Sequence, residues 1–389
     1  MTDRVKDWSR KNLFSSAFNS VLTVVFGVLI LYTLYRSLRF VFLDARWEII
    51  DRNLTNILVF RFPRDELWRV WLALYLFSAA LGFAAGAAAR RAGTGSTSAA
   101  LRRAGPVLVL VAVFLWFSGS FRAVLLTAGV AAVAIGFRAL GRRLPLRTAW
   151  VVLAVAGGIV LAFAAIMAFD GVGFERWGGL MLTVFLAVAG IAISFPIGVL
   201  LALGRRSSLP GVRIVCVAYI ELFRGVPLIT VLFMGAFTLG FFLPPGTPTP
   251  SLETRALVAL VIFTSAYVAE IVRGGLQSVP LGQIEAAHAL GLSTLKTTRL
   301  IVLPQALRAV IPALVGQFIS LFKDTSLVAI IGLTDLLGVA QIITGQPDFV
   351  AQGLLFETLL FASFVYWVGS YSMSRESQRL ERRLGVGER

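Results

Sequence analysis

The sequence predicts an all-α protein, a polytopic transmembrane helical bundle with about ten spans. Of its 389 residues, 58% are hydrophobic and only 14% are charged, whereas water-soluble domains carry about 25% charged residues. Charge-free stretches also recur along the chain, each near or above the roughly 20 residues that a membrane-spanning helix needs. They lie between Lys11 and Arg36, Arg69 and Arg90, Arg147 and Asp170, Arg176 and Arg205, and Arg224 and Glu253.

The spans are expected, in chain order, at about 14–35, 68–89, 106–120, 122–138, 149–169, 178–204, 213–243, 254–274, 303–323 and 355–374. The first run is long and lacks a small-residue cleavage site, so we interpret it as a span and not as a signal peptide. The segment 106–138 could form one kinked helix or two. Two helices give ten spans and place both basic termini in the cytoplasm, as the positive-inside rule favours.

Basic residues gather at the ends of the apolar runs. The formal net charge is +16, from 36 basic and 20 acidic residues, and arginine pairs occur at 90–91, 102–103, 142–143 and 205–206. Cytoplasmic loops of membrane proteins carry this excess. The chain has no continuous basic surface with spaced aromatic residues, so we expect no nucleic-acid partner.

Catalysis and bound metals are not expected. The single cysteine, Cys216, lies in an apolar run, and the sole histidine, His288, lies in a loop, so neither a disulfide nor a histidine–cysteine metal site can be assembled. A packing role for His288 is the simpler expectation. The sequence also lacks the GxxxxGK[ST] loop that holds nucleotide phosphates. We therefore expect no catalytic residue and no cofactor, and any energy must come from another subunit.

Polar residues divide the chain into two parts. Residues 1–177, with about five spans, contain generic apolar runs and are expected to form an N-terminal scaffold. Residues 178–389, with about five further spans, are the expected working core. This part carries charges at or near membrane depth, where they are costly and usually functional: Glu221, Arg224, Glu270, Arg273, Lys323 and Asp324.

Two pairs of these charges sit near the cytoplasmic ends of their spans. Glu221 and Arg224 are three residues apart, as are Glu270 and Arg273, so each pair can interact within one helical turn. Together they could form a network between helices that opens and closes during transport. The alternative is a set of interfacial side chains that reach for the membrane surface.

A second polar group lies toward the outer side of the membrane. Lys323, Asp324, Thr325 and Ser326 follow a span of about twenty residues, which is long enough to cross the hydrocarbon core. They could line a substrate path. The alternative is purely structural, because a lysine at a helix C-terminus is favoured by the helix dipole.

The stretch GQIEAAHALGLSTLKTTRLIVLPQALR, residues 282–308, is semi-polar and rich in small residues. A helix is expected from Gln283 to Leu292, with Glu285 in its first turn, where an anion is favoured. Pro304 suits the first turn of the next span. The small-residue face predicts docking into a groove on another protein, and a helix lying on the membrane surface is the alternative. That face comprises Ile284, Ala287, His288 and Gly291.

This stretch resembles the EAA loop of ABC-importer permeases, whose pattern is EAA-x3-G-x9-I-x-LP. The match has no departures, and it comprises Glu285, Ala286, Ala287, Gly291, Ile301, Leu303 and Pro304. In that family the loop is a coupling helix, here near 283–292, that sits in a cleft of the cytoplasmic ATPase. The phrases YIELFRGVPL, AYVAEIVRGGLQSVPLGQIEAA and LFKDTSLVAIIGLTDLL are similar to the polar amino-acid branch.

The resemblance is strong over 178–385, and the long N-terminal part resembles the larger permeases of general L-amino-acid importers. It implies a type I permease core and a subunit of an ATP-driven importer of polar or broad-range L-amino acids in a bacterial inner membrane. The implied partners are a second homologous permease, a cytoplasmic ATPase dimer, a periplasmic amino-acid-binding protein, the L-amino-acid substrate and membrane lipid. The alternatives are an ion-coupled secondary amino-acid transporter, for which no internal repeat is visible, and a non-transporting membrane scaffold.

Overall fold

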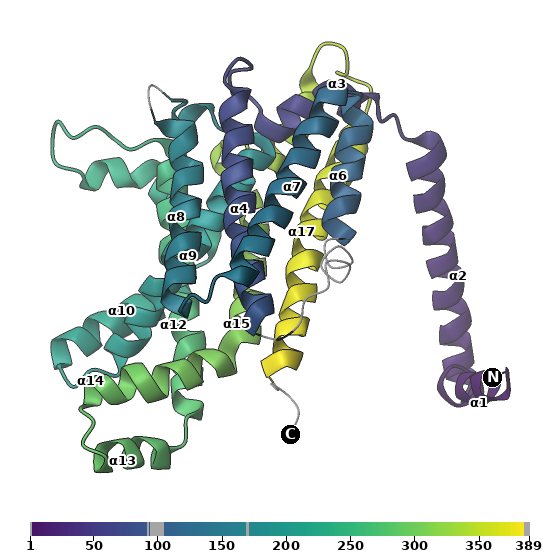
Figure 1. Ribbon diagram of the computed structural model, residues 1–389. Coiled ribbons are helices and arrows are strands. Elements are labelled where there is room, and N and C mark those ends of the chain that lie inside the picture. The colour runs from purple at the N-terminus through teal and green to yellow at the C-terminus, as the bar shows by residue number, and fades with distance from the viewer. Residues whose placement is uncertain (1, 92, 94–104, 169–170, 385–389) are drawn as a thin grey trace. The chain divides into compact units, whose positions relative to one another are not determined.

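The computed structural model describes residues 2–91, 93, 105–168 and 171–384, and every regular element in these ranges is a helix (Figure 1). Contacts divide the chain into two compact units, Met1–Ile49 and Ile50–Arg389. The predicted division at residues 177 and 178 into a scaffold and a working core remains a prediction.

The first unit contains α1 (Thr2–Asn12), α2 (Ala17–Arg39) and the π-helical turn η1 (Phe40–Asp44). The hydroxyl of Ser16 caps α2 by accepting a hydrogen bond from the backbone N–H of Asn19 at 3.1 Å. Apolar side chains are exposed all around α2. A helix that is apolar on every side and unburied by its own chain is suited to lipid contact.

The second unit begins within α3 (Glu48–Val59) and continues through α4 (Leu67–Arg91), α6 (Gly105–Ser118), α7 (Phe121–Arg143) and α8 (Thr148–Met167). The segment 106–138 therefore forms two helices. Gly119 separates them with a φ of +54°, and Ser120 caps the second by accepting from the N–H of Ala123.

Helices α4 and α7 approach each other closely through glycines. A Cβ atom on Gly82 or Gly86 would overlap the backbone carbonyl oxygens of Ala134 and Arg138, and one on Gly141 would overlap that of Phe83. Small residues spaced by four positions permit this backbone contact between membrane helices.

The remaining helices carry the residues that the sequence singled out. They are the 3-10 turn η2 (Phe174–Arg176), α9 (Gly179–Arg205), α10 (Pro210–Gly225), α11 (Leu228–Phe233), the π turn η3 (Met234–Thr238), η4 (Leu239–Phe242), α12 (Leu252–Ser278), α13 (Leu281–Ala289), α14 (Thr294–Thr297), the π turn η5 (Thr298–Val302), α15 (Leu303–Asp324), η6 (Thr325–Ile331), α16 (Leu336–Ile342), η7 (Ile343–Gly345) and α17 (Leu355–Leu384).

The span expected over 213–243 is not one continuous helix. The chain bends by 107° between α10 and the helical segment that begins at Leu228. Pro227 has no N–H to continue the helix, and it disfavours helical backbone at the preceding residue. Val226 accordingly adopts an extended conformation, with φ −109° and ψ 138°.

Seven helices among the described residues are long and apolar enough to cross a membrane, or eight if the bent pair is one span. The expected number of about ten is therefore slightly high. Two expected spans do not meet these criteria: α6 has only 14 residues, and α17, although 30 residues long, contains no stretch that is both long enough and apolar enough.

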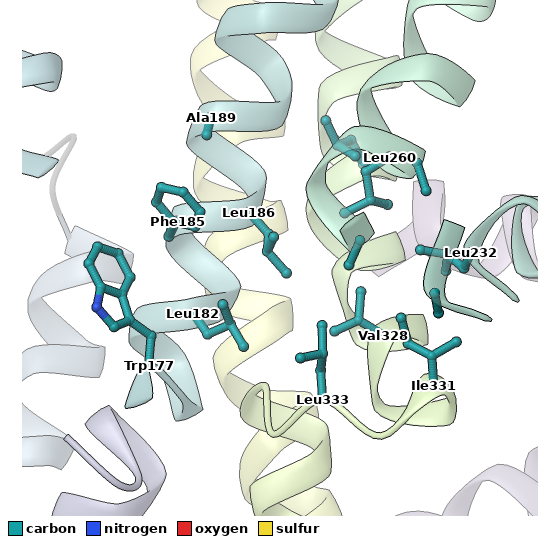
Figure 2. Close-up of a cluster of buried hydrophobic side chains, with 14 of the residues drawn as sticks. Trp177, Leu182, Phe185, Leu186, Ala189, Leu232, Leu260, Val328, Ile331 and Leu333 are labelled. Atoms are coloured by element: carbon teal, nitrogen blue, oxygen red, sulfur yellow. The ribbon is translucent and has the colours of Figure 1, made fainter. Parts of the chain in front are cut away.

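A large cluster of buried side chains holds α8, α9, α11, α12 and η6 together (Figure 2). Trp177, just before α9, is 1% exposed and donates its indole N–H to the carbonyl of Val172 at 2.9 Å. Phe185 on α9 contacts both this ring and Phe163 on α8, with centroid separations of 5.1 and 4.8 Å. Aromatic contacts therefore link the helices on both sides of residue 177.

Candidate functional site

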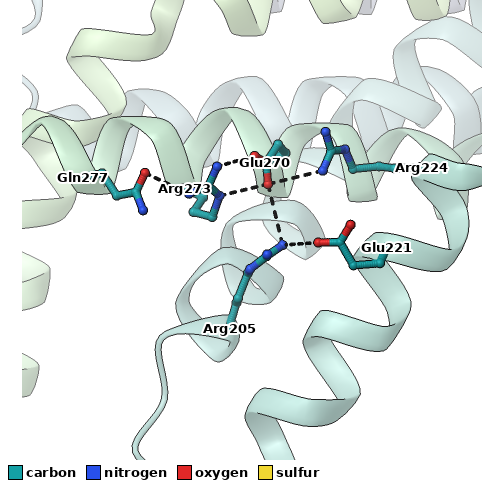
Figure 3. A network of polar contacts seen from close by, with 6 residues as sticks. All are labelled: Arg205, Glu221, Arg224, Glu270, Arg273 and Gln277. Carbon is teal, nitrogen blue, oxygen red and sulfur yellow. Dashed lines mark hydrogen bonds and ion pairs between the residues drawn. The ribbon is translucent and has the colours of Figure 1, made fainter.

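Five charged side chains from α9, α10 and α12 form one network (Figure 3). Glu270 on α12 is its centre: the carboxylate lies 3.5 Å from Arg224 on α10 and 3.7 Å from Arg205 on α9. It also accepts two hydrogen bonds from Arg273, one turn further along its own helix. Glu221 on α10 accepts from Arg205 at 2.8 Å. Three helices are thus connected through one carboxylate.

This network confirms that Glu221, Arg224, Glu270 and Arg273 come together, but the pairing differs from the one expected. Glu221 and Arg224 do not pair with each other; Glu221 binds Arg205, and Arg224 binds Glu270. Sequence reasoning missed Arg205, because it belongs to an arginine pair that also marks a cytoplasmic loop. With three arginines and two glutamates, the network carries one net positive charge.

Hydrogen bonds hold the helices of this network in register. The hydroxyl of Tyr219 on α10 donates to the carbonyl of Ile262 on α12 at 2.9 Å. Arg206 donates to the carbonyl of Leu276 near the end of α12 at 3.2 Å. Below the network, Gly275 packs so closely on α15 that a Cβ atom would lie 2.6 Å from the carbonyl oxygen of Ala306.

Helix α13 follows α12 after the break at Val279 and Pro280, and it lies beyond the lower end of α12 in Figure 1. It begins at Leu281, two residues earlier than expected, so Glu285 lies beyond its first turn. Gly291 ends it with a φ of +76°, and the N–H of Leu292 donates to the carbonyl of Ala287 at 3.1 Å. This is a Schellman cap, which favours glycine at this position.

The predicted docking face of α13 is only partly exposed. Ala287 is 4% exposed, and Ile284 packs against a buried cluster that also contacts Leu303 on α15, so these two residues face the chain itself. Glu285, Ala286 and His288 are exposed instead. His288 therefore does not pack within this chain.

Exposed leucines mark the outward surface of this segment. Leu281, Leu290 and Leu295 are 72%, 82% and 77% exposed. They lie on or beside a short helix whose surroundings include the exposed Lys296 and Arg299. Apolar patches rimmed by polar residues mark surfaces that bind another protein or the membrane.

The end of the EAA-like stretch joins α13 to the membrane helix α15. Ile301 lies in η5, Leu303 is the first residue of α15, and Pro304 occupies its first turn, as expected. The proline's missing N–H costs little there.

Lys323 and Asp324 are the last two residues of α15. Lys323 is 17 residues beyond Ala306, the α15 residue that packs on Gly275 near the charge network, and therefore about 25 Å further along the helix. The structure does not bring them to the network. Thr325 is fully buried and donates to the carbonyl of Phe322 at 2.7 Å, while Ser326 donates to that of Lys323 at 2.7 Å. Lys323 is exposed and Asp324 and Ser326 are half-buried, so of the four residues these three remain available to a ligand.

A buried polar cluster next to this group was not anticipated as a site. Asp335 accepts from the N–H groups of Leu337 and Gly338 at the start of α16, and from the hydroxyl of Tyr366 on α17 at 3.1 Å. Thr183 on α9 accepts from the N–H of Leu336 at 3.0 Å. The motif LTDLL shows the helix cap, but only the fold brings Tyr366 and Thr183 to it.

The chain is similar to known transport proteins. The family model described as "Binding-protein-dependent transport system inner membrane component" matches residues 194–386. The "Inner membrane amino-acid ABC transporter permease protein YhdY" of Escherichia coli (strain K12) is 38% identical over 401 residues, covering 99% of this chain and 95% of that protein.

Two further relatives have the same character. The "Glutamate/glutamine/aspartate/asparagine transport system permease protein BztC" of Rhodobacter capsulatus is 34% identical, covering 97% of this chain and 93% of that protein. The "Probable glutamine ABC transporter permease protein GlnP" of Bacillus subtilis is 40% identical over 53% of this chain and 91% of its own length. The chain therefore belongs to the family of binding-protein-dependent inner-membrane transport components, as a type I ABC-importer permease of the amino-acid branch.

Proposed function

We propose that this permease subunit carries L-amino acids with polar side chains inward across the inner membrane, driven by a separate ATPase that binds at α13. The relatives are named for amino-acid transport, and one is named for glutamate, glutamine, aspartate and asparagine. The observation that carries the coupling role is the pair of exposed leucines 281 and 290 at the two ends of the capped helix α13, which lies outside the candidate membrane spans. A third exposed leucine, Leu295, follows in α14.

The joints of α13 suit it to transmit movement. Val279 and Pro280 separate it from α12, and its buried face packs against the cluster that includes Leu303 at the start of α15. A displacement of α13 therefore acts on two membrane helices together. Ala287 and Ile284 lie on the buried face of α13, and α13 contacts η5, the turn that leads into α15, while the opposite surface remains for the ATPase.

The charge network is the element whose arrangement changes. Glu270 lies ten residues before Pro280, about 15 Å along the chain as a helix, and it contacts arginines from α9 and α10. Movement of the inner end of α12 exchanges these partners, so the network acts as an inner gate with two arrangements. A buried or half-buried carboxylate needs such partners in every state.

Lys323 and Asp324 suit a role at the outer part of the path. A free amino acid carries a carboxylate and an ammonium group, and adjacent opposite charges can replace the water of both. In this proposal a second, related permease completes the path, two copies of the ATPase bind the two coupling helices, and a periplasmic binding protein delivers the substrate.

The test is ATP-driven uptake by the assembled complex in liposomes. With the ATPase and binding protein present, uptake of labelled glutamine must require internal ATP and persist when ionophores collapse all ion gradients. Uptake that follows the ion gradient and ignores ATP identifies a secondary transporter instead.

Leu290→Glu must prevent ATPase binding while insertion stays normal. Leu209→Glu is the matched control. Leu209 is also an exposed leucine, 63% accessible, but it precedes α10 and lies outside α13.

A further inference from the structure

A cavity of about 210 Å³ lies between α12 and the irregular helical segment 228–242. The π turn η3 and the 3-10 turn η4 make the winding of this segment irregular. None of the lining residues is acidic, and most are apolar. They include Phe223, Val231, Met234, Leu239, Phe242 and Val258.

One cation, Arg255, lines this apolar cavity. Its Nη1 donates to the backbone carbonyl of Ala236 in η3. Its Nε is buried and has no hydrogen-bond partner among the described residues. A buried N–H without an acceptor is costly, and more so on a charged group. Glu253, two residues earlier, does not line the cavity.

The position of Arg255 on its helix also favours an anionic ligand. Arg255 lies three residues after Leu252, the first residue of α12, where the helix dipole disfavours a cation. An anion bound beside Arg255 would offset both the dipole and the unused N–H. The helix N-terminus and the guanidinium would then act on the ligand in the same direction.

Arg255 lies near the edge of the hydrocarbon core, from which a long arginine side chain can reach the lipid headgroups. The 27 residues of α12 extend about 40 Å, and the hydrocarbon core is about 30 Å thick. About 5 Å of helix thus extends beyond the core at each end, and Arg255 lies about 5 Å from its first residue. In the orientation of the proposed function, this is the outer surface.

We propose that this cavity binds a phospholipid of the outer leaflet, with its phosphate on Arg255 and an acyl chain along the apolar lining. The lining residues fit an acyl chain, and they offer no carboxylate to pair with the ammonium of a transported amino acid. An anionic headgroup such as phosphatidylglycerol is preferred, because a choline headgroup adds a positive charge near the guanidinium. The proposal rests on the proposed function only for the orientation of α12.

The experiment measures lipid retention by native mass spectrometry of the purified, delipidated chain. Phosphatidylglycerol or phosphatidylcholine with identical acyl chains is added back. We expect one tightly held phosphatidylglycerol, bound about tenfold more tightly than phosphatidylcholine, because only the choline lipid places a second positive charge near the guanidinium. Arg255→Gln should remove this preference, and Val258→Trp, which fills the cavity, should expel the lipid. Arg61→Gln, at an exposed arginine between α3 and α4, is the matched control and should bind as the unmodified chain does.

Unchanged retention in both Arg255→Gln and Val258→Trp overturns the proposal, as does displacement of the lipid by millimolar glutamine, which would make Arg255 a substrate contact. Thermal unfolding shows whether each variant folds. If Arg255→Gln does not fold, Arg255→Lys replaces it, and this variant should keep a weakened preference for phosphatidylglycerol over phosphatidylcholine. Uptake is measured separately. Lipid binding without ATP-driven uptake contradicts only the proposed function, and uptake without lipid binding contradicts only this inference.

Discussion

Asn53 on α3 and Gln346 in the turn after η7 exchange two hydrogen bonds through their side-chain amides, at 3.0 and 2.8 Å, although 293 residues separate them. Asn53 is buried. Beside this pair, Arg52 lies 3.5 Å from Asp348. An early helix thereby fixes the loop that joins α16 to α17.

Breaking this amide pair should destabilise the protein. Asn53→Leu leaves the amide of Gln346 without its partner, at a cost of about 1–3 kcal/mol. Thermal unfolding of the purified chain measures the change. In a double-mutant cycle with Gln346→Leu, the second substitution should cost much less once the first is made. Strictly additive effects would show that the two amides do not act together.

Gly291 should be replaceable only by residues that tolerate its backbone conformation. Gly291→Leu places a branched side chain at φ +76°, which costs about 1–2 kcal/mol and distorts the end of α13. We expect transport and stimulated ATPase activity to be lost while membrane insertion stays normal. Gly291→Asn should retain most activity, because asparagine adopts this conformation more readily. Normal transport by the leucine variant would contradict a coupling role for α13.

Glu270 should be needed for transport more than for assembly. Glu270→Gln leaves Arg205, Arg224 and Arg273 without their shared carboxylate, and removing one partner from a half-buried pair costs several kcal/mol in unfavourable cases. ATP-driven uptake should fall at least about tenfold. Glu376→Gln is the matched control, since the Glu376 side chain is 56% exposed and its partner Arg379 lies one turn away on the same helix, and pairs of an exposed carboxylate contribute little. A variant with intact uptake and lowered complex yield would favour the scaffold alternative.

Lys323 should affect substrate handling without affecting ATPase binding. If it neutralises the substrate carboxylate, Lys323→Gln lowers uptake and raises the substrate concentration needed for half-maximal rate by about tenfold, the scale of one charge-assisted hydrogen bond. Binding of the ATPase should be unchanged, as measured by co-purification. Unchanged uptake kinetics would contradict a substrate contact. Lys323 would then serve only to stabilise the C-terminus of α15 through its charge.

The contact between α4 and α7 should tolerate no side chain at Gly86. Gly86→Val forces the helices apart, and overpacking of this kind typically costs about 1–3 kcal/mol. Gly136, on α7, has open space where its Cβ would be, so Gly136→Val should change the unfolding temperature little. Equal tolerance at both positions would contradict the close approach.

The sequence alone indicated the residues but not always their partners. The glutamates and arginines at 221, 224, 270 and 273 stand out because charge is rare in apolar runs. Spacing favoured pairs within one helix, yet the structure links Glu221 to Arg205 across helices. Which of several nearby arginines a carboxylate selects depends on how helices cross, and local spacing does not contain that information.

The sequence by itself determined the membrane class, the order of the helices and the EAA-like segment, because hydrophobicity, charge-free length and turn residues are local properties. Only the tertiary structure decided that Ala287 and Ile284 face inward, and that Asn53 meets Gln346. These features depend on which surfaces cover one another, and burial of a side chain is set by its neighbours in space, whatever their distance along the chain.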